Sequence, residues 1–124
     1  MNITFYRCSI CGQLICTINN TGVPMICCGA AMEELTPGTT DAATEKHIPV
    51  YHMKDHMVHV TVGSVMHPMD NTHYIEWIAL VTAKGVQIKM LEPGEKPEAD
   101  FALCENEVLI NVYSYCNLHS LWMG

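Results

Sequence analysis

Four cysteines near the N-terminus have the residue type and spacing of a metal site. Cys8 and Cys11 are separated by two residues and followed by Gly12, and the adjacent pair Cys27-Cys28 comes sixteen residues after Cys11. The two-residue gap lets both thiolates of the first pair face one ion, and Gly12 permits the tight turn that this knuckle needs. Tetrahedral sulfur coordination suits zinc or iron, and the spacing alone favours neither metal. Either ion would replace a hydrophobic core that so short a segment cannot build alone.

A second group of potential metal ligands lies in the C-terminal part of the chain, where imidazoles predominate. His67 precedes Pro68, which favours an extended or loop backbone, and Cys116-x-x-His119 lets a thiolate and an imidazole converge from one turn. A shared site explains this grouping better than chance does, but spacing alone does not establish that the side chains converge. The complete group is His47, His67, His73, Cys116 and His119.

The remaining histidines and cysteines are interpreted as ordinary side chains. His52, His56 and His59 fall in a strand–turn–strand region, and His59 lies on the polar face of an alternating segment, so solvation accounts for them. Cys16 and Cys104 fit neither group and are interpreted as small thiols that bind no metal.

Composition and charge narrow the class of protein. The chain has 124 residues, 49% of them hydrophobic and 15% charged, so a folded protein is expected. A net charge of −7 argues against a nucleic-acid partner, because phosphate binding needs clustered Lys and Arg. No apolar run reaches the roughly 18 residues of a membrane span and no signal peptide is evident, so a cytoplasmic protein is expected. Seven cysteines, an odd number, then favour metal binding over a disulfide scaffold.

The elements that must position these ligands are predicted to be strands. Residues 57–62 alternate valines with polar side chains, which predicts a half-buried strand, and the apolar run 74–81 predicts a strand buried on both faces. Two further strands are predicted at 85–91 and 107–115, and a linker at 36–44, where Pro, Gly, Thr and Asp gather. No window has a helical apolar stripe. Short strands at this spacing predict an antiparallel sandwich or barrel.

Taken in chain order, the motifs resemble those of desulfoferrodoxin, the two-iron class of superoxide reductase. The resemblance extends from residue 8 to residue 122. The HPM, HYIEW and YCNLH blocks are specific in combination, whereas the first cysteine pair alone would be weak. The matching segments are Cys8-x-x-Cys11, Cys27-Cys28, Glu45-Lys46-His47, His67-Pro68-Met69, His73-Tyr74-Ile75-Glu76-Trp77 and Cys116-Asn117-Leu118-His119-x-x-Trp122.

The resemblance implies an all-β chain of two domains with two mononuclear iron ions. Residues 1–36 would form a small desulforedoxin-like domain, whose metal could also be zinc. Residues 37–124 would form a catalytic, immunoglobulin-like antiparallel β-sandwich. The first iron would be bound by Cys8, Cys11, Cys27 and Cys28, and the second by His47, His67, His73 and His119 as equatorial ligands, with Cys116 axial.

The resemblance also implies the reaction, a one-electron reduction of superoxide to hydrogen peroxide. Iron accepts six ligands, so five protein ligands would leave one position open for substrate. An axial thiolate would donate electron density to the metal from the side opposite that open position. Glu45 matches a carboxylate that can occupy that position, and Lys46 matches a lysine that attracts and orients superoxide. Because the net charge is −7, Lys46 and the metal must form a local positive focus. The turn after Cys116 can supply backbone N–H groups to its sulfur.

Partners and competing functions complete the predictions. As a family member the chain would be a homodimer that receives electrons from a rubredoxin-like donor, and its N-terminal iron would relay electrons or serve the fold alone. One alternative is a non-catalytic, rubredoxin-like electron carrier, and another is a zinc-knuckle module that binds a protein partner. Visible colour separates these, because ferric–thiolate centres absorb light and zinc does not. An electron-rich thiolate opposes dismutation, since it lowers the potential of the iron.

Overall fold

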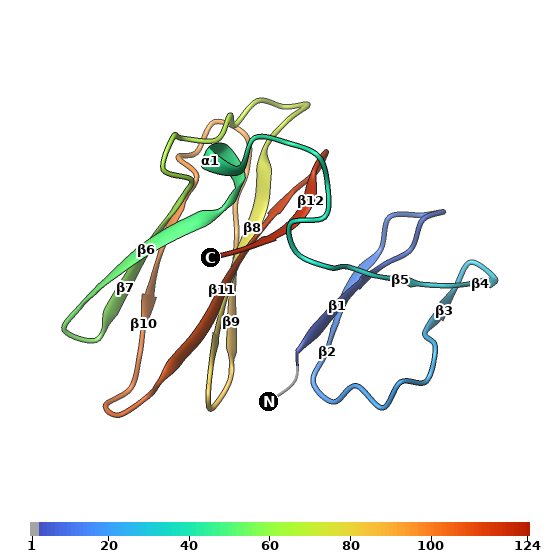
Figure 1. Ribbon diagram of the computed structural model, residues 1–124, viewed down its shortest axis with the longest axis horizontal. Coiled ribbons are helices and arrows are strands. Elements are labelled where there is room, and N and C mark those ends of the chain that lie inside the picture. The colour runs from blue at the N-terminus through green and yellow to red at the C-terminus, as the bar shows by residue number, and fades with distance from the viewer. Residues whose placement is uncertain (1–2) are drawn as a thin grey trace. The chain divides into compact units, whose positions relative to one another are not determined.

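The computed structural model describes residues 3–124, and its regular secondary structure is almost entirely strand (Figure 1). The chain divides into two compact units, one ending at Thr36 and the other spanning Pro37–Gly124. Within the described residues α1 (Thr44–His47) is the one helix, and none is long and apolar enough to cross a bilayer. The predicted all-β class, a cysteine knuckle followed by an antiparallel sandwich, is confirmed.

The N-terminal unit consists of short antiparallel strands that bury few side chains. Its strands are β1 (Thr4–Arg7), β2 (Leu14–Thr17), β3 (Ile26–Cys27), β4 (Ala30–Ala31) and β5 (Glu33–Glu34). One sheet has the order β2-β1-β5, and β3 pairs with β4 in a hairpin. Among the residues described in this unit, only Phe5 and Cys8 are buried. So little burial leaves the unit dependent on another source of stability.

The C-terminal unit is a sandwich of two antiparallel sheets. Its strands are β6 (Pro49–Lys54), β7 (Met57–Val62), β8 (Ile75–Thr82), β9 (Val86–Met90), β10 (Glu98–Ala102), β11 (Leu109–Cys116) and β12 (Ser120–Met123). One sheet has the order β10-β7-β6 and the other β12-β11-β8-β9. Three strands facing four match the strand count of a small immunoglobulin-type sandwich.

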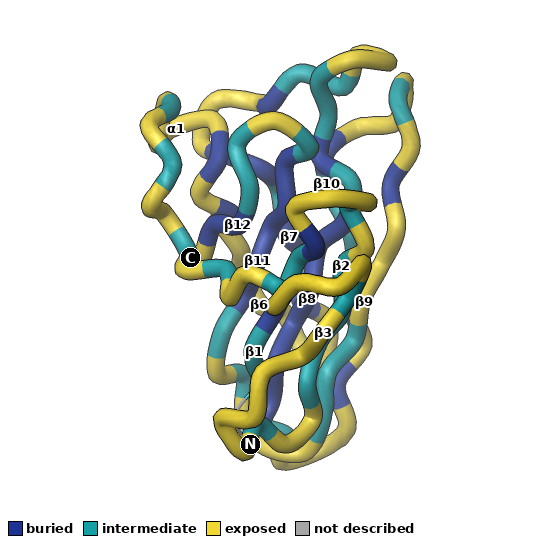
Figure 2. The backbone as a smooth tube through the Cα atoms, turned by 90° about the vertical axis from the view of Figure 1, so that its right-hand side faces the viewer, coloured by how far each residue is buried: buried dark blue, intermediate teal, exposed yellow. Residues whose placement is uncertain are grey.

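The hydrophobic core lies between these two sheets. β7 has the predicted alternation, because Val58, Val60 and Val62 are fully buried while His59 and Thr61 are partly exposed on the other face. β8 is buried along nearly its whole length, as its apolar run predicts. Figure 2 shows the buried backbone following β7, β8 and β11. This core fixes the strand ends from which the site residues project.

In the C-terminal unit, two strands and the helix escape prediction from the sequence. β10 and β12 span only five and four residues, too few to display an alternating pattern, and each forms by pairing with a longer neighbour. α1 is a single turn without an apolar stripe, and tertiary contacts hold it. The Val65 N–H donates to the Glu45 carbonyl at 3.0 Å. A Cβ at Gly63 would lie 2.5 Å from that same oxygen, so only glycine permits this close approach.

Candidate metal centres

The four N-terminal cysteines come together although they lie on separate turns. Their sulfur atoms all lie within 4.8 Å of one another. Sγ of Cys27 is 3.7 Å from Sγ of Cys11 and 4.0 Å from Sγ of Cys28. Four sulfurs bound ~2.3 Å from one ion at tetrahedral corners are about 3.8 Å apart. The sulfur spacing therefore fits a tetrahedral thiolate site.

Left-handed backbone conformations shape both cysteine turns. Gly12 has φ +82°, and its N–H donates to the Cys8 carbonyl at 2.9 Å, which closes the turn that the sequence predicts. Cys28 and Gly29 have φ of 53° and 74°. The second turn thus places a non-glycine residue in a conformation that L-residues seldom adopt.

The thiols are too crowded to ionise independently. Hydrogen bonds from the backbone N–H groups of Cys11 and Ile10 lower the pKa of Cys8 to about 6. Contacts with the Cys11 and Cys8 sulfurs raise the pKa of Cys27 to about 12. The first thiol of this cluster loses its proton readily, and the next thiol loses its proton only with difficulty. A bound cation is therefore required to keep all four as thiolates.

The second group forms at one end of the sandwich, from three segments of the chain. His47 ends α1, His67 and His73 lie in the loop between β7 and β8, and Cys116 ends β11; α1 and this loop occupy the same end in Figure 1. One donor atom from each of these four residues lies within 4.8 Å of the others. His119, in the turn after β11, has its Nδ1 3.1 Å from His47 Nε2 and 3.8 Å from Cys116 Sγ. The structure thus brings together all five residues of the group.

Backbone carbonyls determine which nitrogen of two imidazoles faces the site. Nδ1 of His47 donates to the Ala43 carbonyl at 2.7 Å, and Nδ1 of His67 donates to the Pro68 carbonyl at 2.6 Å. Because a carbonyl only accepts, these bonds assign the proton to Nδ1 and leave a lone pair on each Nε2. The two Nε2 atoms nevertheless lie only 3.1 Å apart. Lone pairs this close repel unless a cation lies beside them, which is the arrangement of two ligands on one ion.

Burial keeps the imidazoles in the neutral form that binds metal. His47 and His67 are each 3% exposed, and burial lowers the pKa of both, to about 4 for His67. Burial also lowers the pKa of His73. Its Nε2 is buried and has no hydrogen-bond partner among the residues that the structure describes. An orphaned buried nitrogen costs free energy that a metal bond would recover.

Cys116 is fully buried, and backbone N–H groups surround its sulfur. Burial raises the pKa of the thiol, whereas hydrogen bonds from the N–H groups of Leu118 and His119 lower it. Both donors belong to the turn after Cys116, which the sequence predicts as a source of backbone N–H groups for this sulfur. A donor set of imidazoles and one thiolate excludes the oxygen-seeking Mg²⁺ and Ca²⁺ and suits iron, copper or zinc. The residues present therefore fit iron.

Glu45 and Lys46 lie on α1 directly before His47, and both are exposed. Besides burial and His119, the positive charge of Lys46 contributes to lowering the pKa of His73. The negative charge of Glu45 acts in the opposite direction on His47. Both charges therefore reach the imidazoles from the solvent side, where an anionic substrate would arrive.

Two supporting side chains were not assigned a role from the sequence. The buried Ser114 hydroxyl donates to the His47 carbonyl at 2.7 Å. The Trp122 ring lies 4.9 Å from the His47 ring, tilted by 31°, and Trp122 Nε1 donates to the His119 carbonyl at 3.0 Å. The available signal was a serine inside the apolar strand β11, a position where a polar group must find a partner.

Asn117 fixes the loop that carries His73. Its Oδ1 accepts from the Tyr74 N–H at 2.9 Å, and its Nδ2 donates to the Thr72 carbonyl at 3.0 Å. Both bonds flank His73, so Asn117 ties this loop to the turn that holds Cys116 and His119. A short polar side chain inside the motif between two ligands was the sequence signal for this role.

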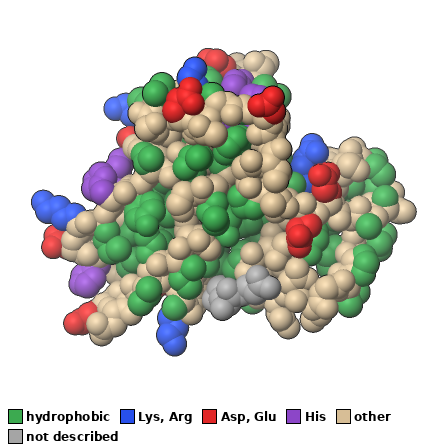
Figure 3. All heavy atoms as spheres, in the orientation of Figure 1, with side chains coloured by type: hydrophobic (Ala, Val, Ile, Leu, Met, Phe, Trp, Pro, Cys, Tyr) green, Lys and Arg blue, Asp and Glu red, His purple; other side chains and the backbone are tan. Residues whose placement is uncertain are grey.

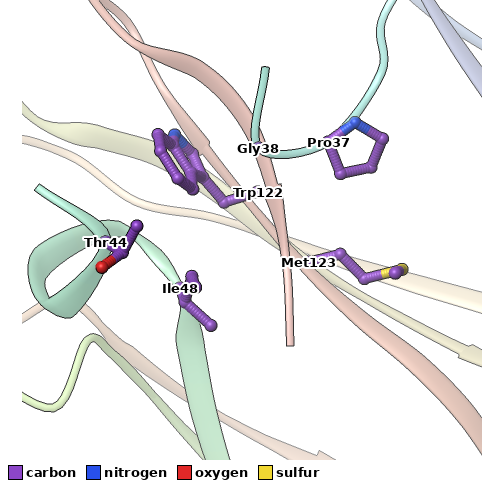
Figure 4. A pocket seen from close by; sticks show the side chains of 6 residues that line it. All are labelled: Pro37, Gly38, Thr44, Ile48, Trp122 and Met123. Carbon is purple, nitrogen blue, oxygen red and sulfur yellow. The ribbon is translucent and has the colours of Figure 1, made fainter. Parts of the chain in front are cut away.

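A pocket of about 180 Å³ lies beside this end of the sandwich (Figure 4). Its lining residues are Pro37, Gly38, Thr44, Ile48, Trp122 and Met123. None of these six is a candidate ligand, and the group has no carboxylate, imidazole or thiol for chemistry. The chemistry therefore lies at the imidazole cluster rather than in this pocket.

Comparison with known proteins gives matches in both sequence and structure. The sequence profile described as Desulfoferrodoxin matches residues 39–124. A desulfoferrodoxin from Nitratidesulfovibrio vulgaris is 44% identical over 118 residues, covering 94% of this chain and 91% of that protein. A desulfoferrodoxin homolog from Archaeoglobus fulgidus is 39% identical over 119 residues, covering 96% and 94%. The crystal structure of the superoxide reductase from Treponema pallidum matches with a TM-score of 0.85 and 39% identity, covering 100% of this chain and 99% of that one.

Proposed function

This chain belongs to the desulfoferrodoxin family, and from that premise we propose that it is a superoxide reductase. Superoxide, one electron and two protons would give one hydrogen peroxide. The observation that carries the proposal is the buried convergence of three imidazoles and one thiol, with donor atoms within 4.8 Å of one another. His119 adjoins them, 3.1 Å from His47.

Iron is the metal that we assign to both groups. The ligands would be Cys8, Cys11, Cys27 and Cys28 in the first site and His47, His67, His73, Cys116 and His119 in the second. Ferrous iron bound in the second site would supply the electron that superoxide takes up. Zinc would substitute in the first site without supplying an electron, because it has no redox chemistry.

The imidazoles hold the metal in a fixed place. The carbonyls of Ala43 and Pro68 orient His47 and His67, since each bonds to the nitrogen that faces away from the site. Partners of this kind set the ring orientation and raise the basicity of the ligand. Neutral rings also need not lose a proton to bind, because burial lowers their pKa.

Cys116 supplies the negative charge of the second site. Its side chain is fully buried, so its thiolate would be screened little by water. The N–H groups of Leu118 and His119 stabilise the charged sulfur. By adding electron density, this thiolate would make a bound iron a better reductant and a poorer oxidant, which would favour reduction of superoxide over dismutation.

Lys46 guides the substrate, and Glu45 modulates access to the site. Superoxide is an anion and the chain carries a net charge of −7, so the protein as a whole repels it. The exposed ammonium of Lys46, whose charge acts on His73, provides the local attraction. Glu45, on the same turn, would be the carboxylate that can bind the iron when no substrate is there. Water would deliver the two protons.

The two domains have different roles in this proposal. Residues 1–36 form the desulforedoxin-like domain, whose iron stores or relays an electron or only holds the domain together. Residues 37–124 form the catalytic domain. A rubredoxin-like protein would donate the electron, and the enzyme would act as a cytoplasmic homodimer.

The carrier and zinc-knuckle alternatives require an incomplete second site. All five candidate ligands are present in the described residues and lie together, which favours the enzyme. The test is to load the protein with iron, reduce it and mix it with superoxide in a stopped-flow apparatus. We expect rapid consumption of superoxide with oxidation of the second iron, and loss of both in Cys116→Ala. An iron-loaded wild type that leaves superoxide unreacted would contradict the proposal.

A further inference from the structure

The outer face of the β10-β7-β6 sheet gathers imidazoles and carboxylates that belong to neither iron site. His52 in β6 lies directly opposite His59 in β7, and His59 lies opposite Asp100 in β10. Glu98 pairs with Thr61, one step further along the same face. These side chains point away from the core because neighbours along a strand alternate between faces. Figure 3 shows histidines at the surface over β6 and β7.

His59 is held between two carboxylates. Its Nδ1 lies 2.6 Å from Oδ1 of Asp100, and its Nε2 lies 3.7 Å from Oε2 of Glu98. A neutral imidazole carries one N–H, and the bond to Asp100 takes it. Nε2 then directs its lone pair at the Glu98 carboxylate. A cation between these two atoms would turn this repulsion into attraction.

The separation of 3.7 Å is close to that of two ligands of one metal ion. It exceeds the usual N–H···O distance of about 2.7–3.2 Å. Bonds of roughly 2.0–2.2 Å from nitrogen and oxygen to an ion, at the tetrahedral angle, separate the two atoms by about 3.3–3.6 Å, so the two side chains would approach by roughly 0.1–0.4 Å on binding. The His59 bond to Asp100 matches the carboxylate–histidine pairing that orients metal-binding imidazoles.

The neighbouring strand offers His52 as a third ligand, which would have to change rotamer because the donor atoms of His52, His59 and Glu98 do not all lie within 4.8 Å of one another. Its ring centroid is 5.3 Å from that of His59, with the planes 48° apart. His52 is exposed, so its ring can rotate between rotamers toward an ion held by His59 and Glu98. Two imidazoles and one carboxylate form the donor set of many zinc sites, with water in the remaining position.

We propose that His52, His59 and Glu98 form a third metal site that takes a late first-row divalent cation of the Zn²⁺ or Ni²⁺ class. Asp100 is a positioning residue that holds the His59 ring in the binding tautomer. The ligands are exposed or partly exposed, so this ion exchanges with solvent, in contrast to a metal held by the buried imidazole cluster. A proton on His59, bridging Glu98 and Asp100 as a surface ion pair, is the competing explanation.

The test uses protein with iron in both sites and Ni²⁺ as the probe. Isothermal titration measures Ni²⁺ binding, and the iron content and visible spectrum are recorded before and after. We expect one saturable Ni²⁺ per chain with no loss of iron. His59→Gln abolishes this binding, and Asp100→Asn weakens it by about 10–100-fold. The matched control is His56→Gln in the β6–β7 turn, which leaves the affinity unchanged.

Three results would overturn the third site: no saturable Ni²⁺ binding, binding that survives His59→Gln, or equal weakening by His56→Gln. The first would leave a proton as the only cation at His59. Unchanged iron spectra and urea midpoints establish that each variant is folded. Glu98→Gln provides a second loss-of-binding variant, because it removes the carboxylate ligand while keeping the side-chain shape.

Discussion

The two units of this chain use metal ligands in opposite ways. In the N-terminal unit only Phe5 and Cys8 are buried among the described residues, and Cys11 and Cys28 are exposed. In the C-terminal unit two sheets enclose a core that includes Phe101, Ile78 and Leu80. The first unit therefore depends on its metal for stability, whereas the second unit is stabilised by its own core and positions the ligands of its metal.

The pKa values of the candidate ligands also differ between the two units. In the first unit, backbone N–H bonds lower the pKa of Cys8 to about 6 while neighbouring sulfurs raise that of Cys27 to about 12. In the second, burial lowers the pKa of His47, His67 and His73, so these ligands are neutral and ready. Thiols that need an ion to ionise together contrast with imidazoles that a core holds in place.

The strongest test of this contrast removes one ligand from the first unit. Cys28→Ala should unfold the N-terminal unit, because metal binding supplies folding free energy on the order of 10 kcal/mol in small thiolate domains. Hydrogen exchange should become fast in β1 and β2 and stay slow in β8 and β11. Cys16→Ala, in the same unit but outside the cluster, is the control and should keep slow exchange. Equal protection in both variants would show that the unit folds without its metal.

The matching change in the second unit should abolish activity and leave the fold intact. His67→Gln removes one ligand from a site that the core still supports, so we expect the rate constant with superoxide to fall by at least about 100-fold. Far-ultraviolet circular dichroism and the exchange of β8 should not change. His56→Gln serves as the matched histidine control. Global unfolding of His67→Gln would contradict the claim that the fold precedes the metal.

The stability of the metal-free sandwich should depend on pH. The pKa of His67 is lowered to about 4, below its unfolded value near 6.5. The unfolded state therefore binds the proton first, and the free energy of unfolding decreases as the pH falls from about 6.5 towards 4. Urea midpoints of metal-free protein at pH 7 and 5 measure this loss. It should be smaller in His67→Gln, and an unchanged loss would remove His67 as a contributor.

A supporting contact should have a smaller effect than a ligand. Ser114→Ala removes the hydroxyl that bonds to the His47 carbonyl, and we expect about a tenfold loss of iron affinity at the second site. Chelator competition, followed by the absorbance of the bound iron, measures it. Ser64→Ala is the comparison, because Ser64 bonds to a carbonyl of the same helix, that of Glu45, from an exposed position. Equal effects would mean that Ser114 does not position the site.

The smallest effect should come from Lys46→Ala. This change should slow the reaction with superoxide severalfold, up to about tenfold at low salt, and flatten its dependence on ionic strength. Stopped-flow rates across a salt series measure both quantities. Lys54→Ala changes the net charge equally but lies at the end of β6, towards the β6–β7 turn, so it should keep the wild-type salt slope. A slope unchanged in Lys46→Ala would exclude steering by this residue.

The sequence predicts those strands and metal ligands that a regular local pattern of residues marks. The alternation at Val58, Val60 and Val62 determined a strand and its buried face, and paired cysteines around tight turns indicated a metal. β10, β12, α1 and the short strands β1 to β5 escape prediction because each is short and is formed by its neighbours rather than by its own pattern.

Contacts between distant residues account for the rest. Ser114 meets His47 across 67 positions, and the row of His52, His59 and Asp100 exists only through strand register. From the sequence alone, the histidines on β6 and β7 are therefore interpreted as solvated side chains. No local pattern relates positions that only the sheet brings together.

The most direct test of the central claim measures the products of a known amount of superoxide. Reduced, iron-loaded protein and oxidised, iron-loaded protein, each in excess over superoxide, are mixed with it anaerobically, and peroxide, oxygen and the oxidation state of the second iron are determined. A reductase with an electron-rich thiolate ligand should yield one hydrogen peroxide for each superoxide from the reduced protein, and superoxide should leave the iron of the oxidised protein ferric. Reduction of that ferric iron with release of oxygen would identify a dismutase and contradict this account.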